Sequence, residues 1–479
     1  MGVATASTTP AEPVVEPAAA ARLPRSVAFR YDALPVRLSD GILTVALADT
    51  QDATVLDALR AAARTPVRAI SLDRDAIRAK LRGAYPDATA EMRGADDAPA
   101  VRAVDAVLAR AAALHASDVH VEPHEHGGRV RVRVDGILRE IETIPARLLG
   151  AFTSRLKLIA GMDISDRRQP QDGRCAIVHD GRTIDARVAS VPTIDGEKLV
   201  VRLLDRHAAA PDLAALGMPA EMLSRYERAL RAPWGFVVVA GPTGSGKTTT
   251  LYASLARLDA ASRNVCSVED PIEMRLPGVA QTQVHPRAGL TFPVVLRALM
   301  RQDPNVVMVG EMRDAETASV AISAALAGQT VFATLHANDA PRAIDRLVEL
   351  GVARHALAAA AGAIVAQRLV RRLCERCRAP EPIPDELRAA LRTTREQWFV
   401  ARGCRACEGT GYLGRAAVYE LLDVDDALRD AIASGAPSGR IAALAAANGY
   451  APMPADGRAK VLAGTTSFAE LRRVVGEPR

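Results

Sequence analysis

Aromatic residues and long apolar runs are both scarce in this sequence. Only 3% of its 479 residues are Phe, Trp or Tyr, so no platform for stacking nucleic-acid bases is apparent. No run of about 18 uncharged apolar residues occurs, so no transmembrane helix is expected. The first basic residue is Arg22, and no basic segment precedes an apolar core near the N-terminus, which argues against a secretory signal. We therefore expect any role at a membrane to depend on a protein partner.

Net charge and cysteine are also sparse. Lys and Arg number 61 and Asp and Glu 56, and the resulting charge of +5 is too small over this length for a nucleic-acid coat. Six cysteines are too few and too unevenly placed for a disulfide scaffold, which indicates a reducing cytosol. Two of them, Cys175 and Cys266, are isolated, and we interpret them as small buried hydrophobic residues. The hydrophobic fraction of 49% and the charged fraction of 24% indicate a globular protein.

The length predicts about three folded units. The expected organisation runs from a flexible tail (1–24) through a first α+β domain (25–85), a polar linker (86–99), a second α+β domain (100–206) and a connector (207–230) to a core (231–372), a tetracysteine module (373–414) and a C-terminal helical part (415–479). In the first domain the pattern predicts strands at Ile42–Leu47 and Val67–Leu72 and helices at Thr54–Ala63, capped by Asp52, and Asp73–Leu81.

The second domain and the core follow different patterns. The second domain is expected to contain a helix at Val101–His115, strands at Arg129–Val134, Thr183–Ala189 and Lys198–Leu204, and a turn at Asp135-Gly136. A helix over Pro219–Ala232 is expected in the connector. In the core, apolar runs at Phe236–Ala240, Val306–Val309 and Val331–Thr334 alternate with helical stretches. This alternation predicts an α/β fold with a parallel sheet covered by helices.

Residues 241–248 match the phosphate-loop pattern G-x-x-x-x-G-K-[ST] in full. An apolar strand leads into them and a helix-forming stretch, Thr249–Leu258, follows, a context that disfavours the alternative of a glycine-rich turn without a ligand. We expect backbone N–H groups to surround phosphates, Lys247 to reach the β- and γ-phosphates, and the Thr248 hydroxyl to complete a Mg²⁺ shell. The predicted nucleotide-binding residues are Gly241, Pro242, Thr243, Gly244, Ser245, Gly246, Lys247, Thr248 and Thr249.

Hydrolysis of a nucleotide also needs a carboxylate on a neighbouring strand. Glu311 follows the apolar run Val306–Val309, and Gly310 occupies the place where an aspartate is usual. A second acidic group, residues 269–273, follows a short strand at Val265–Val268. Because α/β sheets bind ligands at the carboxyl ends of their strands, we expect one of these acids to polarise water. The alternative is an exposed acidic loop.

Two C-x-x-C pairs form a candidate metal site. Cys374 and Cys377 are separated from Cys404 and Cys407 by 26 residues, which are expected to hold a helix at Asp385–Leu391. Four thiolates form a closed tetrahedral site suited to Zn²⁺, which indicates a structural metal. A redox dithiol is the alternative, although two pairs without a thioredoxin-like context argue against it.

Together these motifs resemble the secretion ATPase superfamily that powers type II secretion and type IV pilus assembly. The likeness covers about Ala100 to Arg472, and it is carried by Ser117–Pro123, Glu269–Glu273, Leu296–Asp314 and Thr334–Asp339. It implies a RecA-like P-loop core with a parallel sheet, preceded by two smaller α+β domains, the second PAS-like, and carrying a zinc-binding insert.

The resemblance also implies roles for particular side chains. Glu273 would be the general base that orients water, Glu311 would hold Mg²⁺ through water, and His336 would sense or stabilise the γ-phosphate. Four arginines match positions that reach nucleotide or subunit interfaces: Arg187, Arg202, Arg297 and Arg301. Guanidinium is always charged and planar, which suits a transition state whose charge spreads over three oxygens. The alternative for any one arginine is a surface salt bridge.

One position departs from the pattern. The family's His box usually carries two histidines, and Gln329 stands in the first position here. Because an amide cannot take up a proton, a proton-linked role at residue 329 is in doubt, whereas ATP binding is not.

The spacing is most similar to that of the type II secretion ATPases. Pilus retraction ATPases lack the cysteine pairs, and pilus assembly ATPases carry a longer region than the 116 residues that precede Ser117. The resemblance implies a cytoplasmic hexamer on the inner face of the inner membrane, whose residues 25–85 dock on a membrane platform protein and whose hydrolysis drives a pseudopilus. A pilus assembly ATPase, a nucleic-acid motor and a nucleotide-binding scaffold without hydrolysis remain alternatives; no nucleic acid is expected as a partner.

Overall fold

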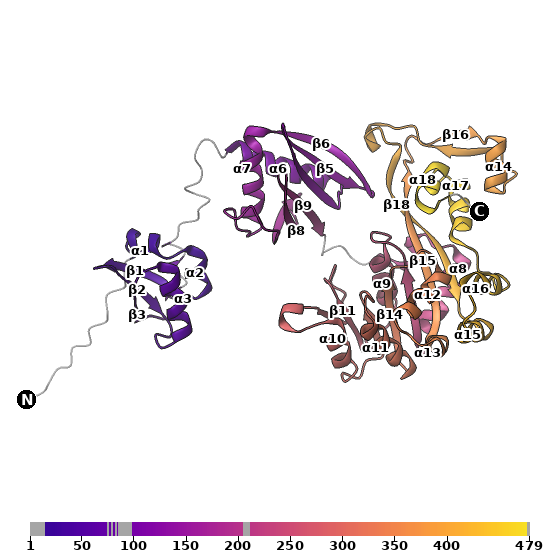
Figure 1. Ribbon diagram of the computed structural model, residues 1–479. Helices are drawn as coiled ribbons and strands as arrows, with labels where there is room; N and C mark the ends of the chain where they lie inside the picture. Colours follow the sequence, from indigo (N-terminus) through magenta and orange to yellow (C-terminus); the bar gives the residue numbers. More distant parts are fainter. Residues whose placement is uncertain are drawn as a thin grey trace, which may run out of the picture. The chain divides into compact units, whose positions relative to one another are not determined.

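The structure is a computed structural model that describes residues 15–73, 76–77, 80–81, 84, 98–204 and 211–476. The chain divides into two compact units, residues 1–105 and 106–479, and each is described by itself (Figure 1). None of the helices in the described ranges has both the length and the apolar character needed to span a membrane.

The first unit is built on a three-stranded sheet. Its strands are β1 (Leu34–Ser39), β2 (Ile42–Leu47) and β3 (Val67–Ser71), in the order β1-β2-β3. Strand β2 runs antiparallel to β1 and parallel to β3, and α3 (Ala53–Ala63) makes the parallel connection. The Asp52 side chain caps α3 by accepting the Val55 N–H at 3.1 Å. Both predicted strands, the helix and its cap are confirmed to within one residue.

The tail predicted for residues 1–24 is wrong from Pro17 onward. Residues Pro17–Arg22 form α1 and Arg25–Arg30 form α2. Ala19 and Leu23 are buried among the hydrophobic residues of this unit, and the Glu16 N–H donates to the Val36 carbonyl at 2.9 Å. Small alanines pack closely enough for this segment to join the core. Of the predicted helix Asp73–Leu81, residues 76–77 and 80–81 are helical, Asp73 is not, and residues 74–75 and 78–79 lie outside the description.

The second unit begins with a six-stranded antiparallel sheet in the order β6-β5-β4-β9-β8-β7. Its strands are β4 (Asp118–His124), β5 (Gly127–Val134), β6 (Ile137–Pro145), β7 (Gln171–His179), β8 (Arg182–Thr193) and β9 (Gly196–Leu204). Helices α6 (Ala98–Ala113) and α7 (Ala146–Ile159) accompany it. The predicted strands and the Asp135-Gly136 turn are confirmed, with both turn residues at positive φ, as a tight hairpin requires. Because α6 begins at Ala98, the predicted linker ends earlier than residue 99.

A seven-stranded sheet follows in the order β12-β11-β13-β14-β10-β15-β18. Its strands are β10 (Gly235–Ala240), β11 (Val265–Glu269), β12 (Val279–Gln283), β13 (Val306–Val309), β14 (Thr330–Leu335), β15 (Ala361–Leu373) and β18 (Tyr412–Asp423). All neighbours are parallel except β15 and β18. The parallel α/β sheet is confirmed, and the three predicted apolar runs are β10, β13 and β14.

The segment predicted as a C-terminal helical part, residues 415–479, begins with strand β18, which extends to Asp423. The strand's sequence contains Ala, Leu and Glu, which favour helices, but pairing with β15 from Ala363 to Leu373 holds it extended. The rest of the segment is helical in α15 (Asp426–Ala433), α16 (Ser438–Ala446), α17 (Met453–Leu462) and α18 (Phe468–Val475).

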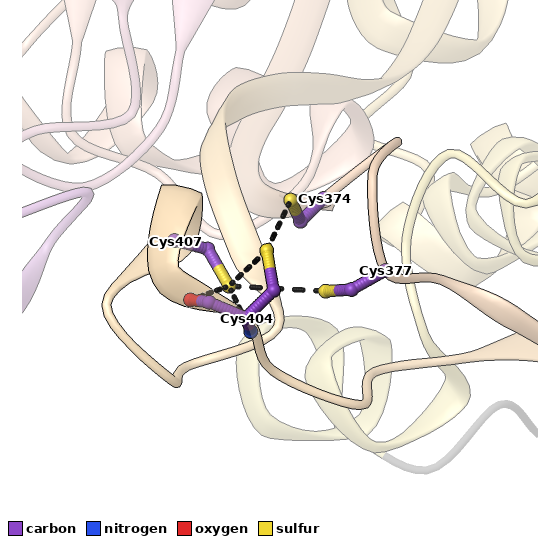
Figure 2. A group of neighbouring side chains, drawn as sticks. All are labelled: Cys374, Cys377, Cys404 and Cys407. Carbon is purple, nitrogen blue, oxygen red and sulfur yellow. Dashed lines mark hydrogen bonds between the residues drawn. The ribbon is translucent and has the colours of Figure 1, made fainter.

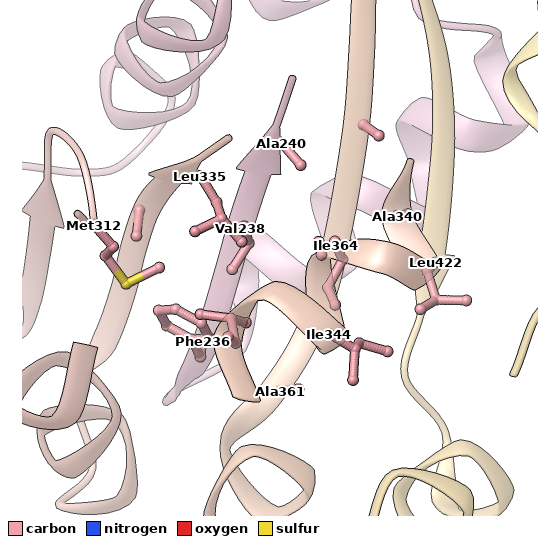
Figure 3. Close-up of a cluster of buried hydrophobic side chains, with 14 of the residues drawn as sticks. Phe236, Val238, Ala240, Met312, Leu335, Ala340, Ile344, Ala361, Ile364 and Leu422 are labelled. Carbon is pink, nitrogen blue, oxygen red and sulfur yellow. The ribbon is translucent and has the colours of Figure 1, made fainter. Parts of the chain in front are cut away.

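Helices cover both faces of the parallel sheet. They are α8 (Ala220–Arg231), which is the predicted connector helix, α9 (Lys247–Ala256), α10 (Phe292–Leu299), α11 (Ala315–Leu326), α12 (Ala340–Glu349) and α13 (Arg354–Ala360). Phe236 and Val238 of β10 gather with Ile344 of α12 and Leu422 of β18 on one face (Figure 3). Val237 and Val239 of β10 belong to the cluster on the other face. Since both faces are buried, the carboxyl ends of the strands remain available for a site.

Residues 373–414 form a small module at the end of β15. A two-stranded ladder of β16 (Ala379–Pro382) and β17 (Gln397–Val400) flanks α14 (Asp385–Leu391), which has the predicted bounds. The two cysteine pairs lie on either side of this hairpin in the sequence.

Candidate active site

The predicted phosphate loop connects β10 to α9, as the sequence context requires. The Gly241 N–H donates to the Leu335 carbonyl at 3.1 Å, which ties the start of the loop to the end of β14. Gly246 has φ +87° and caps α9, whose first residue is Lys247. Gly241 has φ +156°, and a Cβ at this position would lie 2.7 Å from the Gln367 carbonyl oxygen. Glycine is therefore needed where the loop passes β15.

Lys247 lies inside the loop. Its side chain is largely buried, and Nζ donates to the carbonyl oxygens of Gly241 and Pro242 at 2.9 Å each. Burial lowers the pKa of Lys247, and the negative charge of Glu311 opposes that shift. A buried ammonium beside the N-terminus of α9 forms an anion site, because the helix end adds its own positive potential. Thr248 and Thr249 follow in the first turn of α9.

Glu311 and His336 meet at the ends of two adjacent strands. Glu311 lies two residues beyond β13 and His336 directly follows β14; their Oε1 and Nε2 atoms are 2.8 Å apart. Arg313 approaches the other Glu311 oxygen at 2.7 Å. Burial raises the pKa of Glu311, but the hydrogen bond from Arg313 and the charges of His336 and Lys247 bring it below its ordinary value. Glu311 is therefore a carboxylate at neutral pH.

Gly310 explains the missing aspartate. Its N–H donates to the Val268 carbonyl at 2.8 Å, and its carbonyl accepts the Thr334 hydroxyl at 2.5 Å. A Cβ at this position would approach the Cα of Glu269 and the Val268 carbonyl oxygen to 3.2 Å, closer than such contacts usually are. Strands β11 and β13 therefore approach too closely here for a larger residue to fit without adjustment.

The acidic group at residues 269–273 has two environments. Glu269 ends β11 and is 2% exposed, whereas Glu273 lies half-buried on the loop beyond it and Asp270 is exposed. The Glu273 N–H donates to the Tyr252 hydroxyl of α9 at 3.1 Å. The reading of this group as an exposed acidic loop is therefore wrong for Glu269.

The order of the sheet brings the predicted groups to one edge. Strands β11, β13, β14 and β10 are successive neighbours, and all run in the same direction. Their carboxyl ends lead to Glu273, Glu311, His336 and the phosphate loop respectively. A buried lysine, a carboxylate–imidazole pair and a further acid together can bind a phosphate chain and activate water beside it.

The four predicted arginines lie on other elements. Arg297 of α10 pairs with Glu316 of α11, and Arg301 is exposed just beyond α10. Arg187 of β8 and Arg202 of β9 are cross-strand neighbours, and Arg202 Nε lies 3.0 Å from an Asp118 oxygen. Their roles at a nucleotide or subunit interface stay predictions.

Gln329 lies at the opposite edge of the sheet from the phosphate loop. It directly precedes β14, whereas His336 directly follows it. At ~3.3 Å per residue, the strand separates the two positions by roughly 20 Å. The departure at residue 329 therefore lies away from the phosphate-binding end of its own sheet.

Gln367, which belongs to none of the sequence motifs, is 1% exposed in the middle of β15. Its Nε2 donates to the Ser245 carbonyl at 2.7 Å, and its Oε1 accepts the Thr250 hydroxyl at 2.8 Å. The only signal in the sequence is a single amide after the apolar run from residue 361 to 366. Such a buried amide needs polar partners, and the phosphate loop provides them.

The four paired cysteines converge (Figure 2). The Sγ atoms of Cys374 and Cys404 are 3.9 Å apart, those of Cys377 and Cys407 3.8 Å, and all four lie within 4.8 Å of one another. Tetrahedral Zn²⁺ with bonds of ~2.3 Å would set its sulfurs about 3.8 Å apart, so the group fits this ion. The N–H groups of Cys404 and Gly411 both donate to Cys407 Sγ at 3.2 Å, which favours a thiolate.

Known proteins are similar to this chain in sequence. The family described as "Type II/IV secretion system protein" matches residues 93–473, and the MshEN domain matches residues 7–91. Type II secretion system protein HxcR of Pseudomonas aeruginosa is 45% identical over 82% of this chain and 81% of that protein. Type II secretion system protein E of Klebsiella pneumoniae is 44% identical over 82% and 79%. The type IV pilus assembly ATPase PilB of Myxococcus xanthus is 37% identical over 95% and 86%.

Solved structures share the fold at lower identity. The Legionella pneumophila ATPase DotB has a TM-score of 0.56 at 22% identity, over 77% of this chain and 94% of that one. The pilus retraction motor PilT with bound ADP has a TM-score of 0.54 at 23% identity, over 77% and 96%. The family match over most of the sequence, together with these relatives, shows that the chain belongs to the type II/IV secretion system protein family.

Proposed function

We propose that this protein is an ATP hydrolase that drives pseudopilus assembly and protein export by type II secretion. The observation that carries the proposal is the edge of the parallel sheet where Lys247 and the Glu311–His336 pair lie on neighbouring elements. Relatives named type II secretion system protein E or type II secretion system ATPase E are 42–44% identical to the chain, which favours secretion as the process that hydrolysis serves.

The residues at this edge divide the chemistry between them. The N–H groups of residues 241–248 and the Lys247 ammonium hold the β- and γ-phosphates. Thr248 and, through water, Glu311 hold Mg²⁺, which when bound neutralises charge on the phosphates. Glu273 orients the attacking water and accepts its proton, and His336 stabilises the γ-phosphate while it orients Glu311.

The four predicted arginines lie outside the edge of the parallel sheet that carries the other site residues. Arg187, Arg202, Arg297 and Arg301 carry fixed positive charge that would stabilise phosphoryl transfer at an interface between subunits. We propose a ring of six subunits, in which hydrolysis changes the angle between the second N-terminal domain and the core. This movement would transmit work to the pseudopilus.

Two further parts serve assembly. The four cysteines bind Zn²⁺ as a structural ion, which fixes the module that follows β15. Residues 25–85 dock on a platform protein and keep the ATPase on the cytoplasmic face of the inner membrane.

Turnover of MgATP tests the enzymatic proposal. We expect the purified chain to hydrolyse ATP, Lys247→Ala to lose nucleotide binding, and Glu273→Gln to bind ATP but lose turnover by about 100-fold or more. Full turnover in both variants would contradict the site assignment.

The second candidate is pilus assembly, because the Myxococcus PilB relative aligns over 95% of the chain. Complementation separates the two: the gene should restore exoprotein release to a strain without its type II secretion ATPase. Restoration of pili in a strain without its pilus assembly ATPase, with no exoprotein release, would favour the second candidate. Stimulation of turnover by single-stranded DNA would instead indicate a nucleic-acid motor.

A further inference from the structure

Glu269 is a buried carboxylate that has no part in the proposed chemistry. It is the last residue of β11, and its carboxylate oxygens accept hydrogen bonds from side chains of β11, β12 and α9. Oε1 accepts the Ser267 hydroxyl at 2.6 Å and the Gln281 side-chain amide of β12 at 3.0 Å, while Oε2 accepts the Tyr252 hydroxyl of α9. A buried charge with this many partners holds its neighbours in defined positions.

Tyr252 connects this carboxylate to the segment that carries Glu273. Its side chain is 1% exposed, and its hydroxyl donates a hydrogen bond to Glu269 Oε2 and accepts one from the Glu273 backbone N–H at 3.1 Å. Burial and the negative charge of Glu269 both raise the pKa of Tyr252, so the hydroxyl stays protonated and able to donate.

The segment from Asp270 to Leu276 contains no helix or strand, so side chains determine its course. Gln281 holds its far end, because Oε1 accepts the Leu276 N–H at 2.8 Å and Nε2 donates to the Met274 carbonyl at 3.0 Å. Tyr252 holds the backbone at Glu273 itself. Helix α9, which carries Tyr252, starts at Lys247.

We propose that Tyr252, oriented by Glu269, is a positioning residue that places Glu273 relative to the phosphate loop. The inference rests on the proposed function, since it assumes that Glu273 activates water. Because one rigid helix carries both Lys247 and Tyr252, the phosphate site and the base share a common support. A misplacement of a reacting group by about 1 Å can reduce a rate 100-fold without weakening substrate binding.

A purely structural role for the Tyr252 hydroxyl is the alternative, and Tyr226 provides a matched control. Tyr226 is also fully buried, and its hydroxyl bonds to the Ser254 hydroxyl of the same helix α9 at 2.9 Å. It has no hydrogen bond to the segment of Glu273 among the described contacts. Tyr226 lies on α8, so Tyr226→Phe removes an equally buried hydroxyl that contacts α9 without altering the support of Glu273.

The test compares full-length wild type with Tyr252→Phe, Tyr226→Phe and Glu273→Gln. We expect Tyr252→Phe to bind a fluorescent ATP analogue within about twofold of wild type, with kcat reduced about 10- to 100-fold and KM little changed. Tyr226→Phe should retain kcat within about twofold, although both variants lose a buried hydrogen bond.

Glu269→Gln gives a second measurement that leaves both tyrosines in place. Its amide can no longer accept from all of the donors around it, so we expect a smaller fall in kcat. The double variant Tyr252→Phe, Glu269→Gln should be no slower than Tyr252→Phe alone, because the two residues act through one connection.

The outcomes separate this inference from the proposed function. Wild-type kcat in Tyr252→Phe, or an equal loss of kcat in Tyr226→Phe, overturns the positioning role while an inactive Glu273→Gln still supports hydrolysis at this site. Unchanged turnover in Glu273→Gln would overturn the choice of base, and the positioning role with it.

Discussion

Gln367 donates its side-chain amide to the carbonyl of Ser245 at 2.7 Å, although 122 positions separate the two residues in the sequence. Strand β15 therefore holds the phosphate loop through this hydrogen bond. The same side chain also accepts a hydrogen bond from the Thr250 hydroxyl of α9. Strand β15 ends at Leu373, and the next residue is Cys374 of the tetracysteine module. The conformation of the proposed phosphate loop therefore depends on β15, a strand that lies more than 100 residues later in the sequence.

Replacing Gln367 with Leu should weaken nucleotide binding. The change keeps the approximate volume of the side chain but removes the partner of the buried Ser245 carbonyl and one acceptor of the Thr250 hydroxyl. An unsatisfied buried group costs about 1–3 kcal/mol. We expect the Kd for a fluorescent ATP analogue to rise about tenfold. Gln329→Leu is the control, since residue 329 lies at the other edge of the sheet, and it should leave the Kd unchanged. A wild-type Kd in Gln367→Leu would show that the loop keeps its shape without this support.

Metal analysis tests the tetracysteine site. We expect about one Zn²⁺ per chain, and Cys377→Ser should lose the metal and lower the melting temperature, because a structural ion contributes folding free energy directly. Cys175→Ser is the control, since Cys175 is also half-buried but lies on β7. ATP binding should persist in Cys377→Ser. Equal metal content in both variants would contradict a four-thiolate site.

Local sequence patterns predicted much of this structure. The cap at Asp52 and the bounds of α14 depend on a few adjacent residues, so the sequence alone is enough to predict them. The phosphate loop likewise needs only a strand, a glycine-rich turn and a helix in succession. Glu311 was predicted as a site residue because it follows an apolar strand, whereas His336 was predicted because Thr334–Asp339 resembles the family's His box. The parallel sheet brings both positions together.

Contacts between distant segments were not predictable in this way. Strand β18 has a composition that favours helix, and pairing with β15 decides its conformation. Gln367 and Tyr252 carry no motif, and their importance comes from partners at Ser245 and Glu273 that folding brings close. No local pattern distinguishes the burial of Glu269 from that of Glu273, because the difference arises from contacts with β12 and α9.

The buried pair of Lys157 and Glu197 should stabilise the second N-terminal domain. Lys157 is 1% exposed, and its Nζ lies 2.6 Å from a Glu197 oxygen and 2.6 Å from the Asp166 carbonyl oxygen. Lys157→Met leaves Glu197 as a buried charge without this partner, which should cost about 3–5 kcal/mol. We expect a lower urea midpoint by far-UV circular dichroism and partial recovery in the double variant with Glu197→Gln. An unchanged midpoint in Lys157→Met would contradict the prediction.

Glu122 gives this domain a dependence on pH. Its carboxylate accepts hydrogen bonds from Arg131 and Arg129, and Lys198 lies 3.0 Å away. The hydrogen bond from Arg131 is the largest cause that lowers the pKa of Glu122 from 4.5 to about 2. The Glu122 side chain is 10% exposed, but those of Arg129 and Lys198 are 47% and 36% exposed, so solvent screens these contacts in part.

The folded domain should therefore lose stability as the pH falls from 4.5 towards 2. Because the pKa is lower in the folded state, the stabilisation is fully present above pH 4.5 and disappears once Glu122 is protonated in both states. Partial screening by solvent keeps the contribution to the free energy of unfolding below the roughly 3 kcal/mol that the full shift would give. Hydrogen exchange of residues 118–134 in wild type and Glu122→Gln at matched pH measures it. The variant should exchange faster at pH 6, and the difference should vanish near pH 2.

Glu470→Gln, which removes a carboxylate bound by Arg473 and Arg371 in the core, should leave exchange in residues 118–134 unchanged. A difference between wild type and Glu122→Gln that stays constant from pH 6 to pH 2 would show that Glu122 acts through packing and not through its charge.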